Sequence, residues 1–170
     1  MNIEQQQELR TKLRAILSPI SDELGLYISG IEFKTGAQGV HVTIYLDGPQ
    51  GVGIDLCAKF TRNASPILDV EDPIESAYTL EVSSPGFNRL LELPRDFKRF
   101  ETFQIRVKLF QKKKKIDGIL KSSTETDFVV EGESNTRTIS YADCSFVRLL
   151  PTPEQYEQLA PKTNPFTGEE

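Results

Sequence analysis

The first 24 residues carry apolar side chains at the spacing of one helical face. The apolar positions fall three or four residues apart: Leu9, Leu13, Ile16, Leu17, Ile20 and Leu24. This spacing predicts an amphipathic helix. Pro19 interrupts the stripe, so the helix either kinks there or a second turn begins. Gly25 is well placed as its C-terminal cap.

The next 60 residues alternate between strand and helix patterns. Residues 26–33 predict a strand, and residues 40–46 give the clearest two-residue alternation in the chain. A second helical stripe runs from Cys57 to Leu68, where Pro66 should distort the last turn. Residues 78–82 predict a third strand. The order αββαβ predicts two helices on one face of a three-stranded sheet.

The second half of the chain carries five short alternating segments. A helical lead-in at 94–100 precedes predicted strands at 103–109, 116–120, 128–130, 136–140 and 146–150. Five short strands within about 55 residues predict a small β-barrel rather than an open sheet. Thr152 is placed to cap one helical turn bearing Tyr156 and Leu159, and the rest of the tail is expected to be mobile.

A polar corner joins the two halves of this α+β chain. The strand that ends at Val82 is followed by Ser-Ser-Pro-Gly, in which proline fixes the backbone and glycine permits positive φ. We predict an N-terminal α/β domain over 1–86, an elbow over 87–94, a barrel domain over 95–151 and a flexible acidic tail over 152–170. An ordinary turn between strands is the alternative. The residues that we assign to the joint are Ser83, Ser84, Pro85, Gly86, Asn88 and Arg89.

Charge is unevenly distributed along the 170 residues. The formal net charge of −5 divides into −6 for residues 1–93, +4 for 94–150 and −3 for 151–170. This asymmetry suggests nucleic-acid contact by the second half and basic-protein contact by the first, with scattered surface charge as the alternative. No apolar run approaches the ~20 residues of a membrane span, and no secretory pattern opens the chain. We therefore expect a cytoplasmic protein with no membrane partner.

The sequence pattern predicts no combination of polar residues that would form a catalytic site. The single histidine, His41, lies on a predicted strand beside Thr43 and Tyr45. The glycines of loop 47–53 lack the Lys-Ser/Thr ending of a phosphate-binding loop. Cys57 and Cys144 lie far apart and have no metal-ligand spacing. We expect no catalytic, metal-binding or cofactor-binding residues, and no small-molecule substrate.

Two charged segments are candidates for macromolecular contact. The acids Asp69, Glu71 and Asp72 crowd the expected negative end of a helix, which hints at a basic protein partner, although a solvated turn is the simpler interpretation. Lysines at a predicted turn tip would contact RNA phosphates without reading bases, unless they only aid solubility. The residues of this basic candidate site are Lys112, Lys113, Lys114, Lys115, Arg106 and Lys108. Tyr141 is the one aromatic residue expected to be exposed for base stacking.

The joint also carries a specific resemblance. Leu80-Glu-Val-Ser-Ser-Pro-Gly-Phe-Asn-Arg89, preceded by Leu68-Asp-Val-Glu-Asp-Pro-Ile74, resembles the bacterial ribosome maturation factor RimP family. The resemblance extends from about Leu9 to Leu150. This chain departs from the family pattern at Phe87, Asn88 and Leu90, and Asn88 removes a charge beside Arg89.

The resemblance implies a function as well as a fold. It implies a non-enzymatic assembly factor, with an Sm-like (SH3-like) barrel after the α/β domain. The implied partner is the immature small (30S) ribosomal subunit, through ribosomal RNA and a basic small-subunit protein, and the implied state is a monomer. The alternative is an Sm-like RNA-binding module that acts in riboregulation as an oligomer.

Overall fold

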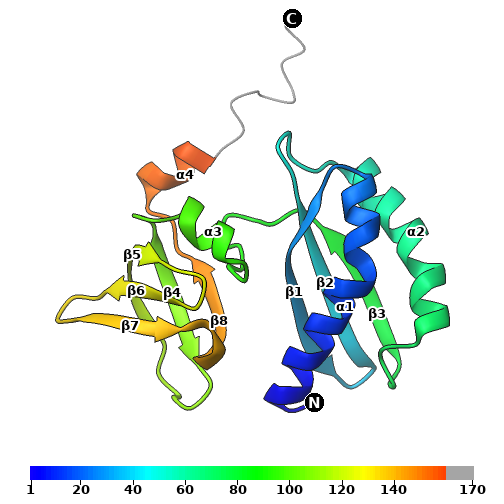
Figure 1. Ribbon diagram of the computed structural model, residues 1–170, viewed down its shortest axis with the longest axis horizontal. Coiled ribbons are helices and arrows are strands. Elements are labelled where there is room, and N and C mark those ends of the chain that lie inside the picture. Colours follow the sequence, from blue (N-terminus) through cyan, green and yellow to red (C-terminus); the bar gives the residue numbers. More distant parts are fainter. Residues whose placement is uncertain (160–170) are drawn as a thin grey trace, which may run out of the picture.

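Two separate sheets organise the chain (Figure 1). The computed structural model describes residues 1–159. Each sheet has its own cluster of buried apolar side chains, one built from residues 13–74 and the other from residues 91–149. The mixed α and β composition that the sequence predicts is therefore confirmed. None of the helices within residues 1–159 is long and apolar enough to cross a membrane.

The first unit has the element order that the hydrophobic pattern predicts. It comprises α1 (Ile3–Glu23), β1 (Tyr27–Gly36), β2 (Gly39–Asp47), α2 (Ile54–Glu71) and β3 (Tyr78–Ser83). Strand β2 lies in the middle, antiparallel to β1 and parallel to β3. The parallel pair requires a crossover, which α2 provides. Both helices pack their apolar stripes on the same sheet, through residues such as Leu17 and Phe60, which are fully buried.

Helix α1 passes through its proline without ending. It begins at a capping box, in which Asn2 and Gln5 exchange side-chain to backbone hydrogen bonds of 2.8 and 2.9 Å. Pro19 lies inside the helix, which continues to Glu23. Pro66 likewise does not end α2, which runs on to Glu71. Burial of the apolar face keeps both helices intact where the proline removes one hydrogen bond.

The second unit is a short helix followed by a five-stranded sheet. Its elements are α3 (Pro94–Arg99), β4 (Gln104–Leu109), β5 (Ile116–Ser123), β6 (Asp127–Glu131), β7 (Thr136–Ser140), the short 3₁₀ helix η1 (Tyr141–Asp143) and β8 (Cys144–Leu149). The strand order is β7-β6-β5-β4-β8, with every neighbouring pair antiparallel. Phe97 and Phe100 of the lead-in helix are buried against this sheet. Helix α4 (Pro153–Leu159) follows, and residues 160–170 of the predicted tail lie outside the described residues.

The sheet of the second unit is not closed into the barrel that the strand pattern predicts. Among residues 1–159, β7 pairs only with β6. Strand β8 pairs with β4 and also with the linker, residues 84–93 between β3 and α3. The backbone N–H of Leu91 donates to the Val147 carbonyl at 2.8 Å, and that of Leu149 donates to the Arg89 carbonyl at 3.0 Å. The expected closure is therefore wrong, because residues 89–91 occupy the edge of β8 that closure would need.

The glycine that a close backbone approach requires is not the one predicted at the polar corner. Gly86 does not have positive φ, and a Cβ there would meet nothing within 4 Å. Gly39, in the β1–β2 hairpin, has φ +112°, and a Cβ there would lie 2.2 Å from the carbonyl oxygen of Ala77. The backbone N–H of the next residue, Val40, donates to that same carbonyl at 3.0 Å. The tight approach is thus at Gly39, not at Gly86.

Replacing these two glycines should have opposite effects. We predict that Gly39→Ala lowers the free energy of unfolding by about 1–3 kcal/mol, because it adds a strained φ and a backbone clash. Gly86→Ala should be neutral or stabilise by up to about 1 kcal/mol, since it only restricts the unfolded chain. Urea unfolding of both variants checks this. Equal losses of stability in the two variants would contradict it.

Candidate functional site: the junction between the units and two charged surfaces

The predicted joint is a paired segment rather than an open turn. Ser83 ends β3, and residues 84–88 cross between the units as the connecting segment of Figure 1. Gly86 and Asn88 are exposed, but Arg89 and Leu90 are buried. From Arg89 onward the backbone hydrogen-bonds to β8, while side chains of the linker reach back to the first unit. The joint therefore touches both units.

Arg89 is the centre of the first polar contact across the junction. Its side chain is only 6% exposed, and its guanidinium donates to Asp47 at the end of β2 (2.8 Å) and to Asp96 in α3 (3.4 Å). The guanidinium also lies over the ring of Phe100, 5.0 Å from its centroid. The Tyr27 hydroxyl lies within hydrogen-bond distance of both carboxylates, 3.2 Å from Asp47 and 3.0 Å from Asp96, and its one proton can be donated to either. One buried cation thus joins carboxylates from the two units.

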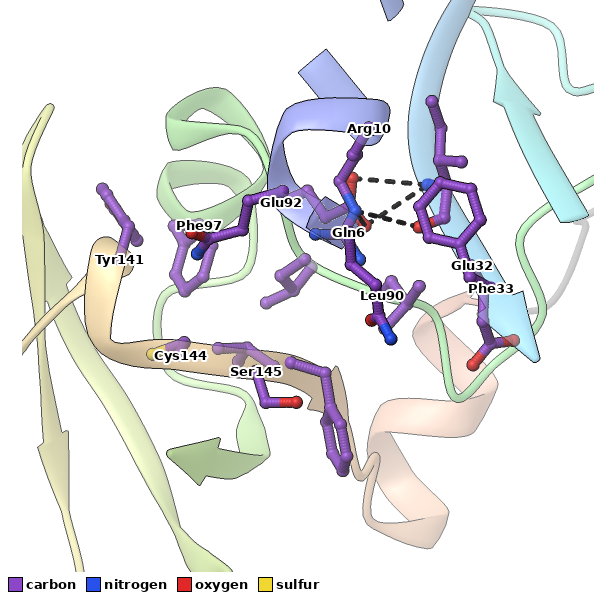
Figure 2. A pocket seen from close by; sticks show the side chains of 15 residues that line it. Gln6, Arg10, Glu32, Phe33, Leu90, Glu92, Phe97, Tyr141, Cys144 and Ser145 are labelled. Carbon is purple, nitrogen blue, oxygen red and sulfur yellow. Dashed lines mark hydrogen bonds and ion pairs between the residues drawn. The ribbon is translucent and has the colours of Figure 1, made fainter. Parts of the chain in front are cut away.

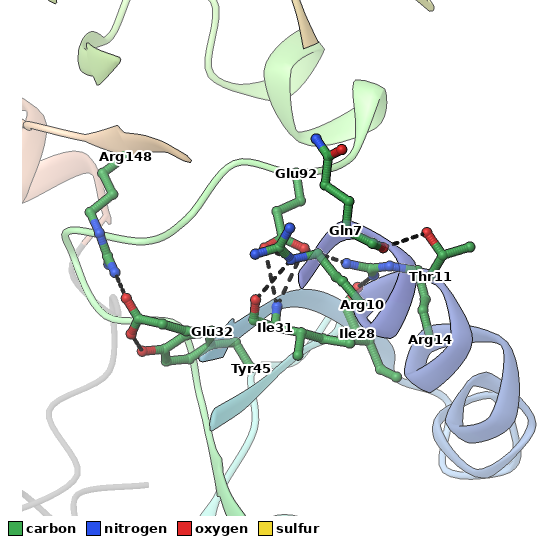
Figure 3. A network of polar contacts seen from close by, with 10 residues as sticks. All are labelled: Gln7, Arg10, Thr11, Arg14, Ile28, Ile31, Glu32, Tyr45, Glu92 and Arg148. Atoms are coloured by element: carbon green, nitrogen blue, oxygen red, sulfur yellow. Dashed lines mark hydrogen bonds and ion pairs between the residues drawn. The ribbon is translucent and has the colours of Figure 1, made fainter. Parts of the chain in front are cut away.

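Glu92 makes the second contact, shown in Figure 3. Its carboxylate accepts from Arg14 at 2.6 Å, lies 3.3 Å from Arg10 Nε, and accepts from the backbone N–H of Ile31 at 3.3 Å. Arg10 and Arg14 stand one turn apart on α1, so they present both guanidinium groups to the same carboxylate. The linker is in this way tied to α1 and β1 of the first unit.

Arg148 of β8 makes the third contact. Its guanidinium pairs with Glu32 of β1, whose other oxygen accepts from the Tyr45 hydroxyl at 3.0 Å. Arg148 also donates to the backbone carbonyl of Asn88 at 3.1 Å. The side chain of Asn88 forms no pair with Arg89, which finds its carboxylates at Asp47 and Asp96.

Burial and pairing move the pKa values of these groups in different directions. Burial alone would raise the pKa of Asp47, but hydrogen bonds from Arg89 and from the Gly48 N–H hold it below its usual value. Burial raises the pKa of Asp96 and of Glu92, and this outweighs their arginine partners. Burial alone would lower the pKa of Arg89, but the hydrogen bond to Asp47 and the charge of Asp96 raise it. The junction thus keeps a permanent cation at its centre.

The lysine tip, residues 112–115, lies in the second unit between β4 and β5. Lys112, Lys113, Lys114 and Lys115 are all exposed. Lys108 donates to the carbonyl oxygens of Lys112 (2.8 Å) and Lys113 (2.6 Å), so these two hydrogen bonds hold the backbone of the loop. Arg106 forms a two-pronged pair with Asp117, at 2.7 and 2.6 Å. Of the six basic candidates, four are exposed on the tip and two are engaged in internal contacts.

The acidic candidates lie in the first unit, around the end of α2. Asp69, Glu71 and Asp72 are exposed, and Asp72 adopts the left-handed conformation (φ 39°) that caps the helix. Within residues 1–159, no three or more His, Cys, Asp or Glu side chains are grouped as a metal would require. These acids are an exposed negative surface.

Two other residues considered from the sequence have structural partners. Tyr141 is not the exposed aromatic that we predicted: it packs on Phe97 and Phe128, with centroids 4.7 and 5.6 Å away. Its hydroxyl donates to the Thr124 carbonyl at 2.7 Å. Position 141 follows β7 in η1, whose short turn directs the ring into the core. His41 lies 2.8 Å from Glu81 on an exposed strand face.

A cavity of about 240 Å³ lies between the units (Figure 2). Its lining comes from α1, β1, the linker and the segment around β8. Arg10 and Glu92 of the second polar contact form part of this lining. Nothing in the sequence pattern indicates the cavity, because its walls come from segments far apart in the chain, chiefly residues 6–10, 31–33, 90–92 and 141–147.

The junction should give a defined pH dependence. We predict that Asp47→Asn lowers the free energy of unfolding by about 1.5–3 kcal/mol at pH 7, since a charged hydrogen bond to a buried guanidinium is removed. Because the pKa of Asp47 is held below its ordinary 3.8, its contribution is complete above that value and disappears as the pH falls through the folded-state pKa.

Urea unfolding of wild type and variant between pH 7 and pH 3 measures that difference. The matched control is Asp117→Asn, which removes an exposed pair and should cost about 0–1 kcal/mol. The gap between wild type and Asp47→Asn should begin to narrow at the acidic end of this range. A gap that is as wide at pH 3 as at pH 7 would argue against the ion pair as its cause.

Comparison with known families agrees with the resemblance carried by the joint. Residues 16–88 match the family model described as RimP N-terminal domain. The match begins inside α1, spans the whole three-stranded sheet and ends at the residue before Arg89. The predicted resemblance to the RimP family is confirmed over this part of the chain: residues 16–88 are similar to the RimP N-terminal domain.

Proposed function

We propose that this protein binds the immature small ribosomal subunit in the cytoplasm and assists its assembly without catalysing a reaction. The observation that carries the proposal is the RimP N-terminal domain at residues 16–88, followed by a second unit with an exposed lysine tip. Ribosomal RNA offers a dense array of phosphates, and ribosomal proteins are commonly basic. A protein with one basic and one acidic surface can bind the RNA phosphates with the first and a basic ribosomal protein with the second.

The RNA-facing surface in this proposal is the lysine tip, Lys112–Lys115. Four exposed ammonium groups on one turn neutralise phosphates and release counterions, which gives salt-dependent affinity without base recognition. Lys108 holds the turn through two backbone carbonyls, which supports the presentation of the tip. Arg106 and Lys108 contribute to this surface by fixing it, since their own charged groups have internal partners.

The protein-facing surface is the end of α2. Asp69, Glu71 and Asp72 place three carboxylates beside the negative end of a helix dipole, an arrangement unfavourable for the isolated protein. Lysine or arginine side chains of a basic ribosomal protein would relieve that repulsion. The joint then fixes the angle between the two surfaces, through residues that act together: Ser83, Ser84, Pro85, Gly86, Asn88 and Arg89.

The second unit is proposed to be Sm-like and the protein monomeric. A short helix followed by five consecutive antiparallel strands supports an Sm-like unit. Within the described residues, the linker covers the outer edge of β8 and only β7 keeps a free edge in this sheet. A ring of copies needs two complementary free edges, so this arrangement favours the assembly factor over an oligomeric riboregulator. Light scattering separates the two: a stable oligomer would favour the alternative.

Neutralising the lysine tip should reduce the salt dependence of binding. We predict that Lys112–Lys115→Gln lowers the slope of log K against log salt by about 0.7–0.9 for each phosphate that the tip no longer neutralises. Co-sedimentation with immature small subunits across a salt series measures the slope. The matched control replaces four exposed cations elsewhere with glutamine, Lys12, Lys59, Arg62 and Lys121. Identical slopes for both variants would remove the tip from the RNA contact.

Neutralising the acidic surface should weaken binding without unfolding the protein. We predict that Asp69→Asn, Glu71→Gln and Asp72→Asn together reduce subunit affinity about tenfold or more, as complementary charges are removed. Stability should hold or rise slightly, because repulsion at the helix end falls and asparagine tolerates the left-handed conformation of position 72. The control variant combines Asp22→Asn with Glu23→Gln. If the triple variant binds the subunit as tightly as this control, the three acids are solvated surface only.

A further inference from the structure

We propose that the cavity between the two units binds one unpaired nucleobase of single-stranded RNA. This deepens the proposed function and rests on it, because it assigns a second, base-contacting site beside the phosphate-contacting lysine tip. At about 240 Å³ the cavity is smaller than the ~300–1,000 Å³ typical of drug-sized ligands, so it suits a single flat ring system.

Four aromatic side chains line this cavity: Phe33, Phe97, Tyr141 and Phe146. Phe97 and Tyr141 pack on each other, so the proposal rests on the other two, which come from different units. Phe33 comes from β1 and Phe146 from β8, and each is only partly buried. Phe33 has the Arg10 guanidinium 5.6 Å from its ring centroid, and Phe146 has Lys115 and Arg148 at 5.8 Å each. Aromatic rings with neighbouring cations are the usual means of holding an unstacked base and its phosphate. Lys115 also belongs to the lysine tip, so an RNA strand on the tip lies close to this cavity.

The polar side chains of the cavity suit the edge of a base. Gln6, Gln7 and Ser145 line it, and within residues 1–159 none of their side-chain polar atoms has a hydrogen-bond partner (Figure 2 shows Gln6 and Ser145). Carboxamide and hydroxyl groups both donate and accept, which matches the mixed donors and acceptors of a base edge.

The charges around the cavity favour a ligand that carries phosphate. Its two carboxylates are already paired, Glu92 with Arg10 and Arg14, and Glu32 with Arg148. Lys115 adds a further cation at the rim beside Phe146. Since these guanidinium groups are occupied, an acidic peptide side chain would use Lys115 alone and leave the ring faces and the amides without a partner, whereas a nucleotide would use all three. The observations therefore favour a nucleobase over a peptide.

Photocrosslinking tests the site directly. The full chain is irradiated with decauridylate that carries one central 5-iodouridine, and the linked peptides are mapped by mass spectrometry. We expect crosslinks at Phe33 or Phe146. In anisotropy titrations, Phe146→Leu should bind decauridylate about tenfold more weakly, since leucine keeps the apolar volume but removes the stacking face. Tyr156→Leu removes an exposed aromatic outside the cavity and should bind as wild type does.

Further measurements identify the ligand and guard against misfolding. Excess uridine monophosphate should abolish the crosslink only if the cavity also accepts a free nucleotide; persistence of the crosslink assigns it to RNA. Duplex RNA of equal length should bind equally to wild type and Phe146→Leu, because its bases are not available. If Phe146→Leu melts at a lower temperature than wild type, the variant Gln6→Glu, on the surface of α1, is tested in its place. It should also weaken decauridylate binding.

The outcomes separate this site from the proposed function. Crosslinks confined to residues outside the cavity, or equal weakening of single-stranded and duplex RNA binding in Phe146→Leu, would overturn the nucleobase site. A wild-type chain that co-sediments with immature subunits but crosslinks elsewhere overturns the cavity alone. A chain that does not co-sediment overturns the proposed function, and the crosslink map to decauridylate still decides the cavity.

Discussion

The buried guanidinium of Arg89 is the interaction on which the arrangement of the two units depends. A permanent cation that is 6% exposed requires anionic partners, and it finds them in Asp47 of the first unit and Asp96 of the second. Removing either partner would leave charge uncompensated in a region of low dielectric. The backbone of the linker must therefore pass where its side chain reaches both carboxylates. Few arrangements of the two units relative to each other satisfy that condition.

The contacts of Glu92 and Arg148 restrict the same junction in other directions. Glu92 ties the linker to α1 and β1, and Arg148 ties β8 to β1. Meanwhile residues 89–91 hydrogen-bond along β8, so the linker behaves as a sixth strand at that edge. The open sheet and the fixed junction thus have one cause. Because the linker hydrogen-bonds along the outer edge of β8, that edge is not available to pair with β7. The same hydrogen bonds hold the linker in a fixed position between the units.

The local elements could be predicted from the sequence because each follows from neighbouring residues. The helical stripe ending near Leu24, the alternation at 40–46 and the polar corner at Ser83–Gly86 all match observed elements or their ends. The contacts between units could not be predicted, because Arg89 and Asp47 lie 42 residues apart and no periodicity links them. For the same reason the strand pattern alone wrongly predicts a closed barrel. The prediction for Tyr141 is wrong because its ring turns inward through η1, a three-residue element with no pattern of its own.

The proposed function requires that the lysine tip and the acidic end of α2 keep a fixed relation, and that relation rests on the Arg89 junction. Electron paramagnetic resonance distance measurement tests this most directly. Spin labels at Lys59→Cys in α2 and Lys121→Cys in β5, both exposed positions, report on the two units once Cys57 and Cys144 are replaced by alanine. We predict one narrow distance distribution for the otherwise wild-type chain and a broad one after Arg89→Met. A broad distribution with Arg89 present, or an equally narrow one without it, would contradict the dependence of the junction on this residue.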